Sequence, residues 1–572
     1  MSAPLRLTLA FLALLLAGSA WAESADRPGV AAIASAHSGA TEAGFEVLAA
    51  GGNAFDAAVA VSAALAVAEP YSSGFGGGGF WLLHRAEDGF ETMVDGRETA
   101  PAAATRDMYV GPDGRVNRRA SLDGPLAAGI PGMLAGLAHI NERYGRLSLA
   151  RCLAPAIRLA RDGVEIGERY HRMVGFRAGV MNQDPTTARI FLDGGQQPQV
   201  GWVLRQPELA RTLELVAGQG AEVFYRGEIA RNLVDGVRAA GGIWTLDDLA
   251  GYRVKEREPI RGRYHDMDIV SAPPPSSGGI VLVQALNILE RLDLDQADAQ
   301  TRRHLVVEAM RRAYRDRADY LGDPDFVDVP VARLVDKDYA ARRAETVDAG
   351  RATPSSSLPG LKGVSASAAD AARAARPRGT DTTHFSVLDA DGNRVAGTLS
   401  INIPFGAAFT PPATGVLLND EMDDFSAAPL APNIYGLVGV EANAVGPGKR
   451  PLSSMTPTFL TRGDRVAVLG TPGGSRIITM VLLGTLDFYA GNDPASWVAL
   501  ERYHHQYEPD LVQFESTALS EEARADLRRR GHELKELGRR YGNMQAILWD
   551  RGETRVRAAS DPRGEGTADV RR

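Results

Sequence analysis

The sequence predicts an α+β protein in which helices sandwich antiparallel sheets. Two observations support this fold class. From residue 382 onward, short strand-like runs follow one another and are joined by turn signals such as Asp391-Gly392. Long apolar or amphipathic helical patterns stand before and after these runs, so each sheet has helices with which to cover an apolar face.

Helical patterns dominate the chain before residue 351. The first two cover 39–50 and 54–68, and the second is apolar on nearly every face, which predicts a buried helix. Further helical patterns cover 131–163, 279–292 and 301–320, and Thr245 begins a shorter one. The last long range is rich in arginine, and we expect these side chains to form a solvated face: Arg302, Arg303, Arg311, Arg312, Arg315 and Arg317.

Strand patterns in the first half lie next to a glycine run. The run 74–79 leads into a strand at 80–84, and a second strand at 91–95 ends just before Arg97. The glycines precede a strand instead of opening a helix, so close packing of backbone is favoured over a phosphate cradle. Strand alternation returns in several later segments: 252–268, 383–389, 394–402, 466–471, 546–549 and 554–559. A helix is expected at 477–486.

The first 22 residues have the pattern of a secretory signal peptide. Arg6 supplies a positive charge, residues 7–17 form a short apolar run, and Ala20-Trp21-Ala22 fits a cleavage site. A retained membrane anchor is the alternative, but the apolar run is short for a bilayer and polar chain follows it. We therefore expect cleavage after Ala22, no membrane anchor afterwards, and a periplasmic or secreted bacterial location.

Composition narrows the classes of function and of domain organisation that remain. The net charge of -8 comes without a long basic run, so a nucleic-acid partner is not expected. The single cysteine, Cys152, excludes an internal disulfide, and its apolar neighbours favour a buried small side chain over a nucleophile. Length alone would suggest roughly three or four domains, but no linker divides the 572 residues in that way.

Residues 351–379 differ from the rest of the chain. They are rich in serine, alanine and proline and poor in large apolar residues, which predicts a mobile segment. Immediately after it stands Asp381-Thr382-Thr383-His384. Read alone, these residues are the polar start of an edge strand.

A second reading makes Thr382 a nucleophile. A threonine hydroxyl needs a base, and the α-amino group of the same residue can act as one if the chain is cut before it. An α-amine has a pKa of about 7.7–8.0, so part of it is neutral at pH 7 and can take the hydroxyl proton. No Gly-x-Ser-x-Gly elbow, phosphate-binding loop or zinc helix offers other chemistry, and the adjacent His504 and His505 do not suggest a metal site.

The stretch around Thr382 closely resembles the processing site of the γ-glutamyltransferases, also called γ-glutamyl transpeptidases, which are N-terminal-nucleophile hydrolases. The resemblance extends over nearly all of the chain after the signal segment. It rests on matches in the same order at 51–58 (GGNAFDAA), 76–80, Arg97-Glu98 with Ala100-Pro101, 419–425 (NDEMDDF), 446–455 (GPGKRPLSSM), 473–476 (GGSR) and 559–563 (ASDPR).

The resemblance implies a fold and a maturation step. It implies a four-layer αββα sandwich formed jointly by two subunits that autoproteolysis produces. The cut would fall between Asp381 and Thr382, giving a large subunit of residues 23–381 and a small subunit of residues 382–572 that pair with each other. The segment 351–379 would then let the new carboxyl end move away.

The resemblance also assigns roles to individual residues. Thr382 would be the nucleophile, assisted by Ser400, with Gly473 and Gly474 stabilising the oxyanion at a helix N-terminus. Arg97 would bind the α-carboxylate of a γ-glutamyl group with Ser453 and Ser454, while Glu421, Asp424 and Asn402 bind its α-ammonium. Tyr435, in a lid at 429–440, would meet Asn402 and gate the site. Without the resemblance, the acidic cluster would suggest a solvated turn or a calcium site, and the serine and glycine pairs ordinary turns.

We therefore expect an exported γ-glutamyltransferase with glutathione hydrolase activity and no metal or organic cofactor. It would take the γ-glutamyl group from glutathione or a related amide and pass it to water, an amino acid or a peptide through an ester on Thr382. A cephalosporin or glutaryl acylase is the nearest alternative, although a glutaryl group has no ammonium for Glu421 and Asp424. A non-catalytic exported binding or scaffold protein is the alternative from another class.

Overall fold

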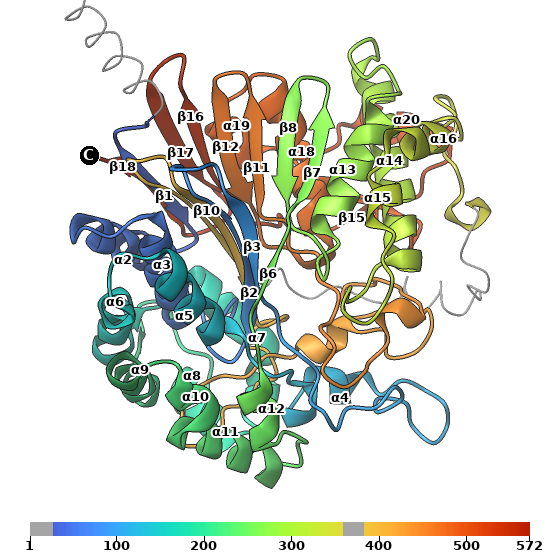
Figure 1. Ribbon diagram of the computed structural model, residues 1–572. Coiled ribbons are helices and arrows are strands. Elements are labelled where there is room, and N and C mark those ends of the chain that lie inside the picture. The colour runs from blue at the N-terminus through green and yellow to red at the C-terminus, as the bar shows by residue number, and fades with distance from the viewer. Residues whose placement is uncertain (1–26, 359–381) are drawn as a thin grey trace, which may run out of the picture.

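The structure is a computed structural model and describes residues 27–358 and 382–572. The predicted signal segment 1–22, Asp381 and residues 359–379 lie outside the described residues. The fold is mixed α/β: two antiparallel sheets lie at the centre and helices lie on both sides of them (Figure 1). In the described part of the chain, no helix has both the length and the hydrophobicity to span a bilayer.

The larger sheet has seven strands in the order β18-β1-β9-β10-β2-β3-β6. Every neighbouring pair is antiparallel. Its strands are β1 (Ala31–Ser35), β2 (Gly78–His84), β3 (Glu91–Gly96), β6 (Lys255–Arg257), β9 (Thr383–Leu388), β10 (Arg394–Ser400) and β18 (Thr567–Arg571).

The second sheet has six strands in the order β17-β16-β12-β11-β8-β7, again antiparallel throughout. Its strands are β7 (Ile260–Tyr264), β8 (Met267–Ser271), β11 (Thr458–Arg462), β12 (Arg465–Gly470), β16 (Gln545–Asp550) and β17 (Arg555–Ser560). Short strands form two small sheets: β4 (Val164–Glu165) with β5 (Val203–Leu204), and β13 (Tyr503–His504), β14 (Val512–Phe514) and β15 (Leu534–Glu536).

Strand alternation sends side chains of the larger sheet into two different cores. In β2, Phe80 and Leu82 join the cluster that also holds residues of the six-stranded sheet. Their neighbours Trp81 and Leu83 join the cluster formed with the helices on the opposite face. Successive side chains of a strand point to opposite faces, so this sheet is apolar on both. The two sheets therefore pack face to face, with β9 and β10 against β12.

Helices cover the outer face of each sheet (Figure 1). On the seven-stranded sheet lie α2 (Ser38–Ala49), α3 (Ala54–Ala68) and α5 (Met133–Tyr144), with α6 (Leu149–Asp162) packed on α3. On the six-stranded sheet lie α13 (Gly278–Leu289), α18 (Ile477–Tyr489) and α19 (Pro494–Ala499). Around α13 pack α14 (Ala299–Tyr320), α15 (Val331–Leu334) and α16 (Lys337–Ala344), and α20 (Glu521–Arg530) contacts α14. Cys152, on α6, is buried, as predicted.

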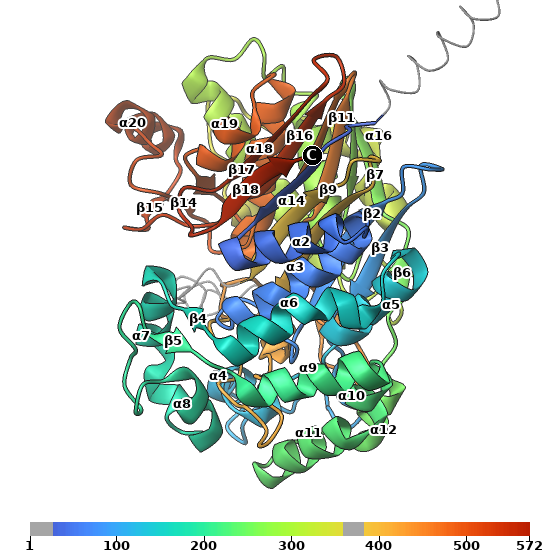
Figure 2. The same ribbon diagram turned by 90° about the vertical axis from the view of Figure 1, so that its left-hand side faces the viewer.

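Residues 164–244, for which we predicted no secondary structure, form further helices at one end of the molecule (Figure 2). They are α7 (Glu168–Met181), α8 (Pro185–Phe191), α9 (Pro207–Gln219), α10 (Glu222–Arg226) and α11 (Glu228–Ala239). Thr245 then caps α12 (Leu246–Gly251) in a capping box, as predicted. The short helices are α4 (Arg118–Leu122) and the 3₁₀ helices η1 (Pro125–Ala127), η2 (Ser355–Ser357), η3 (Glu421–Asp424), η4 (Glu441–Asn443) and η5 (Gly474–Arg476).

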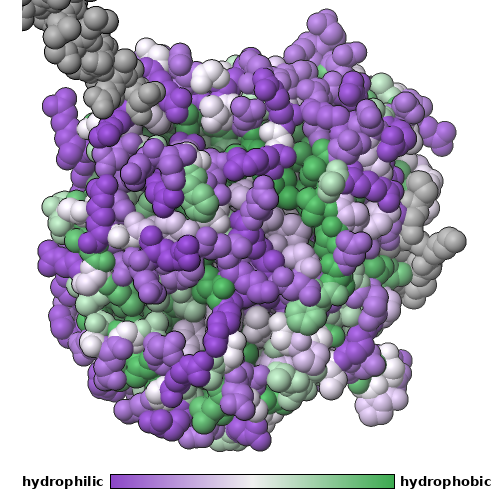
Figure 3. Space-filling view, viewed as in Figure 1, coloured by the Kyte–Doolittle hydropathy of each residue, from purple (hydrophilic) through white to green (hydrophobic). Residues whose placement is uncertain are grey.

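The prediction of a solvated arginine face on α14 is wrong. Arg311, Arg312, Arg315 and Arg317 are buried, whereas only Arg302 and Arg303, at the start of the helix, are partly exposed. Glu308 pairs with Arg311 at 3.1 Å and Arg312 at 2.6 Å, and Asp510 also pairs with Arg311, so two carboxylates face the two guanidinium groups. The periodicity could not reveal this because the packing partners come from distant segments. The face in Figure 3 is mainly hydrophilic, with apolar side chains between the polar ones.

Both sheets combine strands from before and after residue 382. In the larger sheet, β1 lies between β9 and β18, while β10 pairs with β2. In the smaller sheet, β8 pairs with β11. The described segments 27–358 and 382–572 therefore share both sheets and both main cores.

Candidate active site

Thr382 lies at the start of β9, in the middle of the larger sheet. The register pairs Thr383 with Leu399, so Thr382 lies opposite Ser400 at the end of β10. Oγ1 of Thr382 is 3.3 Å from Oγ of Ser400. Ser400 Oγ also accepts a hydrogen bond from the backbone N–H of Asn402 at 2.9 Å. Ser400 therefore contacts Thr382 as the resemblance implied.

The glycine run before β2 lets the backbone approach this corner closely. A Cβ atom on Gly77 would lie 2.2 Å from the carbonyl oxygen of Ser400, and one on Gly76 would lie 2.1 Å from that of Leu417. A larger residue at either position would push β2 or its neighbours away. This confirms the prediction that the run serves close packing.

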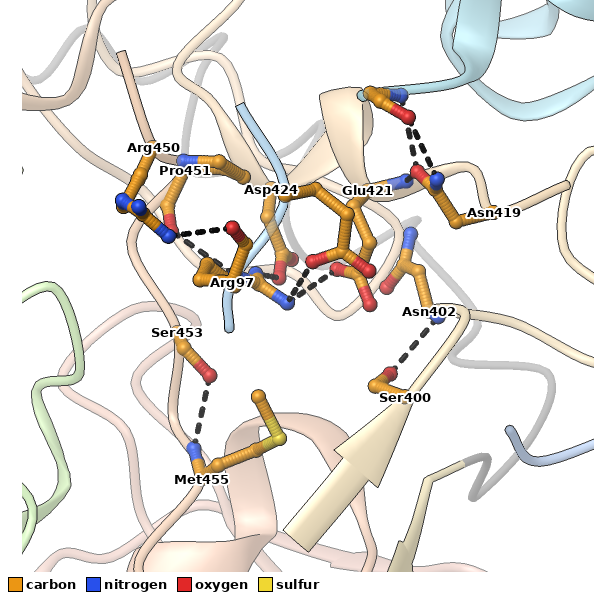
Figure 4. A network of polar contacts seen from close by, with 12 residues as sticks. Arg97, Ser400, Asn402, Asn419, Glu421, Asp424, Arg450, Pro451, Ser453 and Met455 are labelled. Atoms are coloured by element: carbon orange, nitrogen blue, oxygen red, sulfur yellow. Dashed lines mark hydrogen bonds and ion pairs between the residues drawn. The ribbon is translucent and has the colours of Figure 1, made fainter. Parts of the chain in front are cut away.

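Arg97 follows β3 directly, as predicted, and its guanidinium is surrounded by acidic side chains (Figure 4). Nη1 lies 2.7 Å from Glu421 Oε2 and 3.5 Å from Glu98 Oε2, while Nη2 donates to Asp424 Oδ2 at 2.6 Å. Nε donates to the carbonyl oxygen of Pro451 at 3.2 Å. Arg97 is 1% exposed, so the guanidinium is held with little freedom.

Three carboxylates around one arginine cannot all stay ionised without cost. Burial raises the pKa of Glu98 well above its usual value, and nearby Glu421 raises it further. Burial also raises the pKa of Glu421 to about 7, against the opposing effect of Arg97. Neither carboxylate oxygen of Glu421 has an aligned hydrogen-bond donor among the described residues. The cluster therefore has acceptor capacity for a further cation.

Asn402 occupies a strained position between Ser400 and the acidic cluster. Its φ is 75°, which is uncommon for a residue other than glycine. Its Nδ2 donates to the carbonyl oxygen of Asp420 at 3.0 Å and to Oδ2 of the same residue at 3.1 Å. With Nδ2 engaged, the carbonyl Oδ1 is the part of the side chain that could accept from an ammonium.

Ser453 and Ser454 also line the cavity. Oγ of Ser453 accepts the N–H of Met455 at 3.1 Å, and Oγ of Ser454 accepts from Nη2 of Arg317 at 3.4 Å. Because each oxygen accepts a hydrogen bond, each hydroxyl retains its own proton for donation. Such donors suit a carboxylate.

Gly473 and Gly474 join β12 to α18. Both have positive φ, 148° and 56°, and η5 begins at Gly474. A Cβ on Gly474 would lie 2.4 Å from the ring of Tyr435, so only glycine fits beneath that side chain. The turn therefore brings backbone to the cavity wall at the start of a helix, where N–H groups can stabilise an anion.

The predicted lid lies over the cavity. The hydroxyl of Tyr435 donates to the backbone carbonyl of Asn402 at 2.8 Å, which confirms the expected contact between these residues. Asn433, in the same segment, donates from Nδ2 to Asp424 Oδ1 at 3.1 Å. The segment is therefore fastened both to the chain just after β10 and to the acidic cluster.

These groups surround one cavity with an empty volume of about 300 Å³. It is lined by Arg97, Thr382, Ser400, Asn402, Asp424, Tyr435, Leu437, Ser453, Ser454, Met455, Gly474, Ser475 and Ile477. The lining includes most of the residues that the sequence nominated. Gly473 directly precedes the lining residue Gly474 in the chain. Glu421 forms an ion pair with Arg97, which lines the cavity (Figure 4).

Sequence reasoning missed three polar residues around this cavity. Glu98 was part of a matched motif but received no role, although this buried acid, together with Glu421, raises the pKa of Arg97. Asn433 was inside the predicted lid, yet nothing in the pattern showed that it reaches Asp424. Arg317 belonged to the helix expected to be solvated. Only the fold brings these groups together.

Potential metal ligands lie elsewhere. His304, Glu308 and His532 converge, but their atoms are already engaged. Arg311 donates to Nδ1 of His532, whose Nε2 lies 2.7 Å from Nδ1 of His304, and Nε2 of His304 lies 2.9 Å from the Asp348 carbonyl. A neutral hydrogen-bonded chain accounts for these nitrogens, so the group does not fit a cation site. His504 and His505 are buried and bond to Gln506 and Asp510.

Structural comparison indicates the class of protein to which this cavity belongs. The crystal structure of cephalosporin acylase from Bacillus halodurans has the same fold. Its TM-score is 0.81 at 27% identity, and the match covers 94% of this chain and 95% of the acylase.

Sequence comparison identifies the family. A family model described as gamma-glutamyltranspeptidase matches residues 40–570. The glutathione hydrolase proenzyme of Pseudomonas sp. (strain A14) is 42% identical, over 92% of this chain and 91% of its own length. The glutathione hydrolase proenzyme of Escherichia coli (strain K12) is 41% identical, over 93% and 90%. The chain therefore belongs to the gamma-glutamyltranspeptidase family.

Proposed function

We propose that this protein is a γ-glutamyltransferase with glutathione hydrolase activity, which acts through a γ-glutamyl ester on Thr382. One observation carries the proposal: a single cavity brings the Thr382 hydroxyl together with Arg97, Asp424 and Ser454. The family membership and the names of the two relatives support the same reaction.

Maturation begins with a self-cleavage. The hydroxyl oxygen of Thr382 attacks the carbonyl carbon of Asp381, and the peptide bond to the Thr382 nitrogen breaks as an ester forms. Water then hydrolyses the ester, leaving a carboxylate on Asp381 and a free α-amine on Thr382. The contact of Ser400 with the Thr382 hydroxyl supports a role in holding it for this attack.

The donor binds through both charges of its γ-glutamyl group. Arg97, Ser453 and Ser454 bind the α-carboxylate, and Asp424, Glu421 and Asn402 bind the α-ammonium. The substrate's own charges would replace part of the Arg97 ion pairs. This binding holds the γ-carbonyl near Oγ1 of Thr382, where fixed geometry lowers the barrier.

Transfer takes two steps. The α-amine of Thr382 accepts the hydroxyl proton as Oγ1 attacks the γ-carbonyl carbon, and backbone N–H groups at Gly473 and Gly474 stabilise the oxyanion. The amide C–N bond breaks, the leaving amine takes the proton, and the ester remains. Water then yields glutamate, or the amine of an amino acid or peptide yields a new γ-glutamyl amide. No metal or organic cofactor takes part.

The acylase activity of a structural neighbour is the second candidate. The acidic cluster favours γ-glutamyl transfer, because a glutaryl side chain carries no ammonium for Glu421 and Asp424. An acylase of that specificity would leave these buried carboxylates without a substrate partner.

The mature protein would be a four-layer αββα sandwich of two subunits, residues 23–381 and 382–572. The sharing of both sheets by the two segments supports an inseparable pair after cleavage. Residues 1–22 would direct it to the periplasm or the exterior, and their removal would leave it without a membrane anchor.

Intact-mass spectrometry of the purified protein tests the proposal. The wild type should give two pieces of about 38 and 20 kDa, by proportion to chain length, and the smaller should begin at Thr382. Thr382→Ala should stay uncut and should not release the amine of a γ-glutamyl anilide. A single uncut wild-type chain with full activity would overturn the mechanism.

A further inference from the structure

Arg317, near the end of α14, is a buried cation beside the cavity that has no acidic partner of its own. It is 5% exposed. Other buried arginines of α14 have ion pairs, such as Arg312 with Glu308 and Arg315 with Asp316. Among residues 27–358 and 382–572, no carboxylate forms an ion pair with Arg317. A buried guanidinium without a counterion is costly, so its place in the fold needs an explanation.

Its hydrogen bonds lead to the serine pair of the cavity. Nη2 lies 3.4 Å from Oγ of Ser454, which lines the cavity. Nε donates to Oγ of Ser277 at 3.0 Å, and Ser277 in turn donates to the carbonyl oxygen of Ser453 at 2.7 Å. One guanidinium thus contacts Ser454 directly and reaches Ser453 through one intermediate side chain.

The charges around Arg97 leave a role for a second cation. Arg97 faces Glu98, Glu421 and Asp424, so its positive charge is already outnumbered before a substrate arrives. A substrate carboxylate placed there would meet net negative charge unless another cation acts on it. Arg317 contacts Ser454, on the cavity wall, and forms no ion pair with the carboxylates that pair with Arg97 among the described residues. Burial lowers the pKa of Arg317, and Tyr314 and Asp424 only partly oppose this effect, which agrees with a charge that has no ion-pair partner.

We propose that Arg317 is a positioning residue for the α-carboxylate of the donor, acting through the hydroxyl of Ser454. The inference rests on the proposed function and names a residue that the sequence comparison with the family did not assign. By donating to Oγ of Ser454, Arg317 orients that hydroxyl so that its proton points toward the cavity. Its uncompensated charge strengthens the same hydrogen bond in a low-dielectric setting.

If Arg317 has this role, its replacement should impair only the donors that carry an α-carboxylate. The test compares two anilide donors: L-γ-glutamyl-4-nitroanilide, and 4-aminobutyryl-4-nitroanilide, which lacks the carboxylate but keeps the amine and the scissile amide. In Arg317→Gln, KM for the first donor should rise about tenfold or more, in line with the loss of a hydrogen bond to a charged group. The kcat/KM for the second donor should change less than about twofold. Arg317→Lys, which keeps the charge, should show a smaller rise.

Two further variants separate positioning from folding. Ser277→Ala leaves Arg317 in place but removes its Nε partner, so it should raise KM for the carboxylated donor in the same sense and more weakly. Arg315→Gln removes a buried arginine of the same helix that does not contact the serine pair. It should lower the melting temperature without changing the ratio of kcat/KM between the two donors. Autocleavage and circular dichroism report whether each variant folds.

Equal losses for both donors in Arg317→Gln and Ser277→Ala would overturn the inference, because they would mean a general structural effect. L-glutamate binding separates this failure from failure of the proposed function. If the wild type releases no nitroaniline but binds L-glutamate in calorimetry, the reaction proposed for Thr382 is wrong. The inference then stands only if Arg317→Gln weakens glutamate binding, and unchanged binding refutes it.

Discussion

The hydroxyl oxygens of Thr382 and Ser400 lie 3.3 Å apart at facing ends of β9 and β10. Ser400 is held in turn by the backbone N–H of Asn402. The register between β9 and β10 therefore sets the distance between the two hydroxyls, and no flexible loop is involved.

This relation predicts how processing depends on Ser400. Ser400→Ala should slow self-cleavage about tenfold, the effect of one lost hydrogen bond at the attacking hydroxyl. Ser400→Thr keeps the hydroxyl and should cleave at nearly the wild-type rate. The cleaved fraction is followed over time on denaturing gels after synthesis in vitro. Equal rates for the alanine and threonine variants would contradict the role.

Gly474 should tolerate no side chain. In Gly474→Ala, the Cβ would lie 2.4 Å from the Tyr435 ring at a φ of 56°, so the turn or the ring must move. Displacing one oxyanion donor lowers kcat by roughly 10²–10³ in other enzymes, and we expect a loss of that order. Gly220→Ala is the matched control, because Gly220 also has a positive φ but nothing within 4 Å of its Cβ. Its kcat should be unchanged, even if its stability falls.

Ligand affinity should rise as Glu421 ionises. Burial raises the pKa of Glu421 to about 7, and only the ionised carboxylate attracts the ammonium of a γ-glutamyl group. The inhibition constant of L-glutamate should therefore fall between pH 6 and 8, and Glu421→Gln should weaken binding and flatten this dependence. An unchanged pH profile in Glu421→Gln would place the titrating group elsewhere.

Ionisation of Glu421 should also lower the free energy of unfolding. Its pKa is higher in the folded protein than the usual 4.5, so its contribution to the free energy of unfolding is complete below pH 4.5. That contribution is lost as the pH rises through about 7. A bound ammonium should reverse part of this loss, which thermal unfolding with and without L-glutamate can measure.

Tyr435 should gate the cavity. Tyr435→Phe loses the hydrogen bond to Asn402 but keeps the ring over Gly474, so a small rise in KM is expected. Tyr435→Ala removes the ring and should raise KM further, while bulkier γ-glutamyl donors gain relative to small ones. Fluorescence quenching of a bound competitive ligand reports accessibility. If Tyr435→Ala left KM, donor preference and accessibility unchanged, the lid would have no gating role.

Glu308 should stabilise the fold through its ion pairs with Arg311 and Arg312 of α14. Burial opposes ionisation of Glu308, but Arg311 and Arg312 outweigh it and hold the pKa at about 2. Glu308 thus stabilises the fold fully above pH 4.5 and less as the pH falls toward 2. Glu308→Gln should cost about 3–5 kcal/mol in urea unfolding at pH 7. The exposed Glu87→Gln is the control and should cost less than about 0.5 kcal/mol.

Much of the architecture followed from local patterns. The apolar run 54–68 became the buried helix α3, and the strands flanking Asp391-Gly392 became β9 and β10. Residues 164–244 remained unassigned, although Asp184-Pro185 marks the start of α8 and Pro207 and Gly220 mark the two ends of α9. The burial of the α14 arginines was not predicted, because a charged side chain is usually exposed unless it is paired, and the sequence does not show the pairs.

The sequence by itself determined the motif around Thr382, the strands that hold it and the residue types of its cavity, because these depend on local periodicity and on short motifs. The tertiary structure alone decided which charges meet. It placed Asp424 beside Arg97, 327 residues away, and Arg317 behind Ser454, 137 residues away. The physical reason is that burial and ion pairing depend on distances in space, which no spacing along the chain encodes.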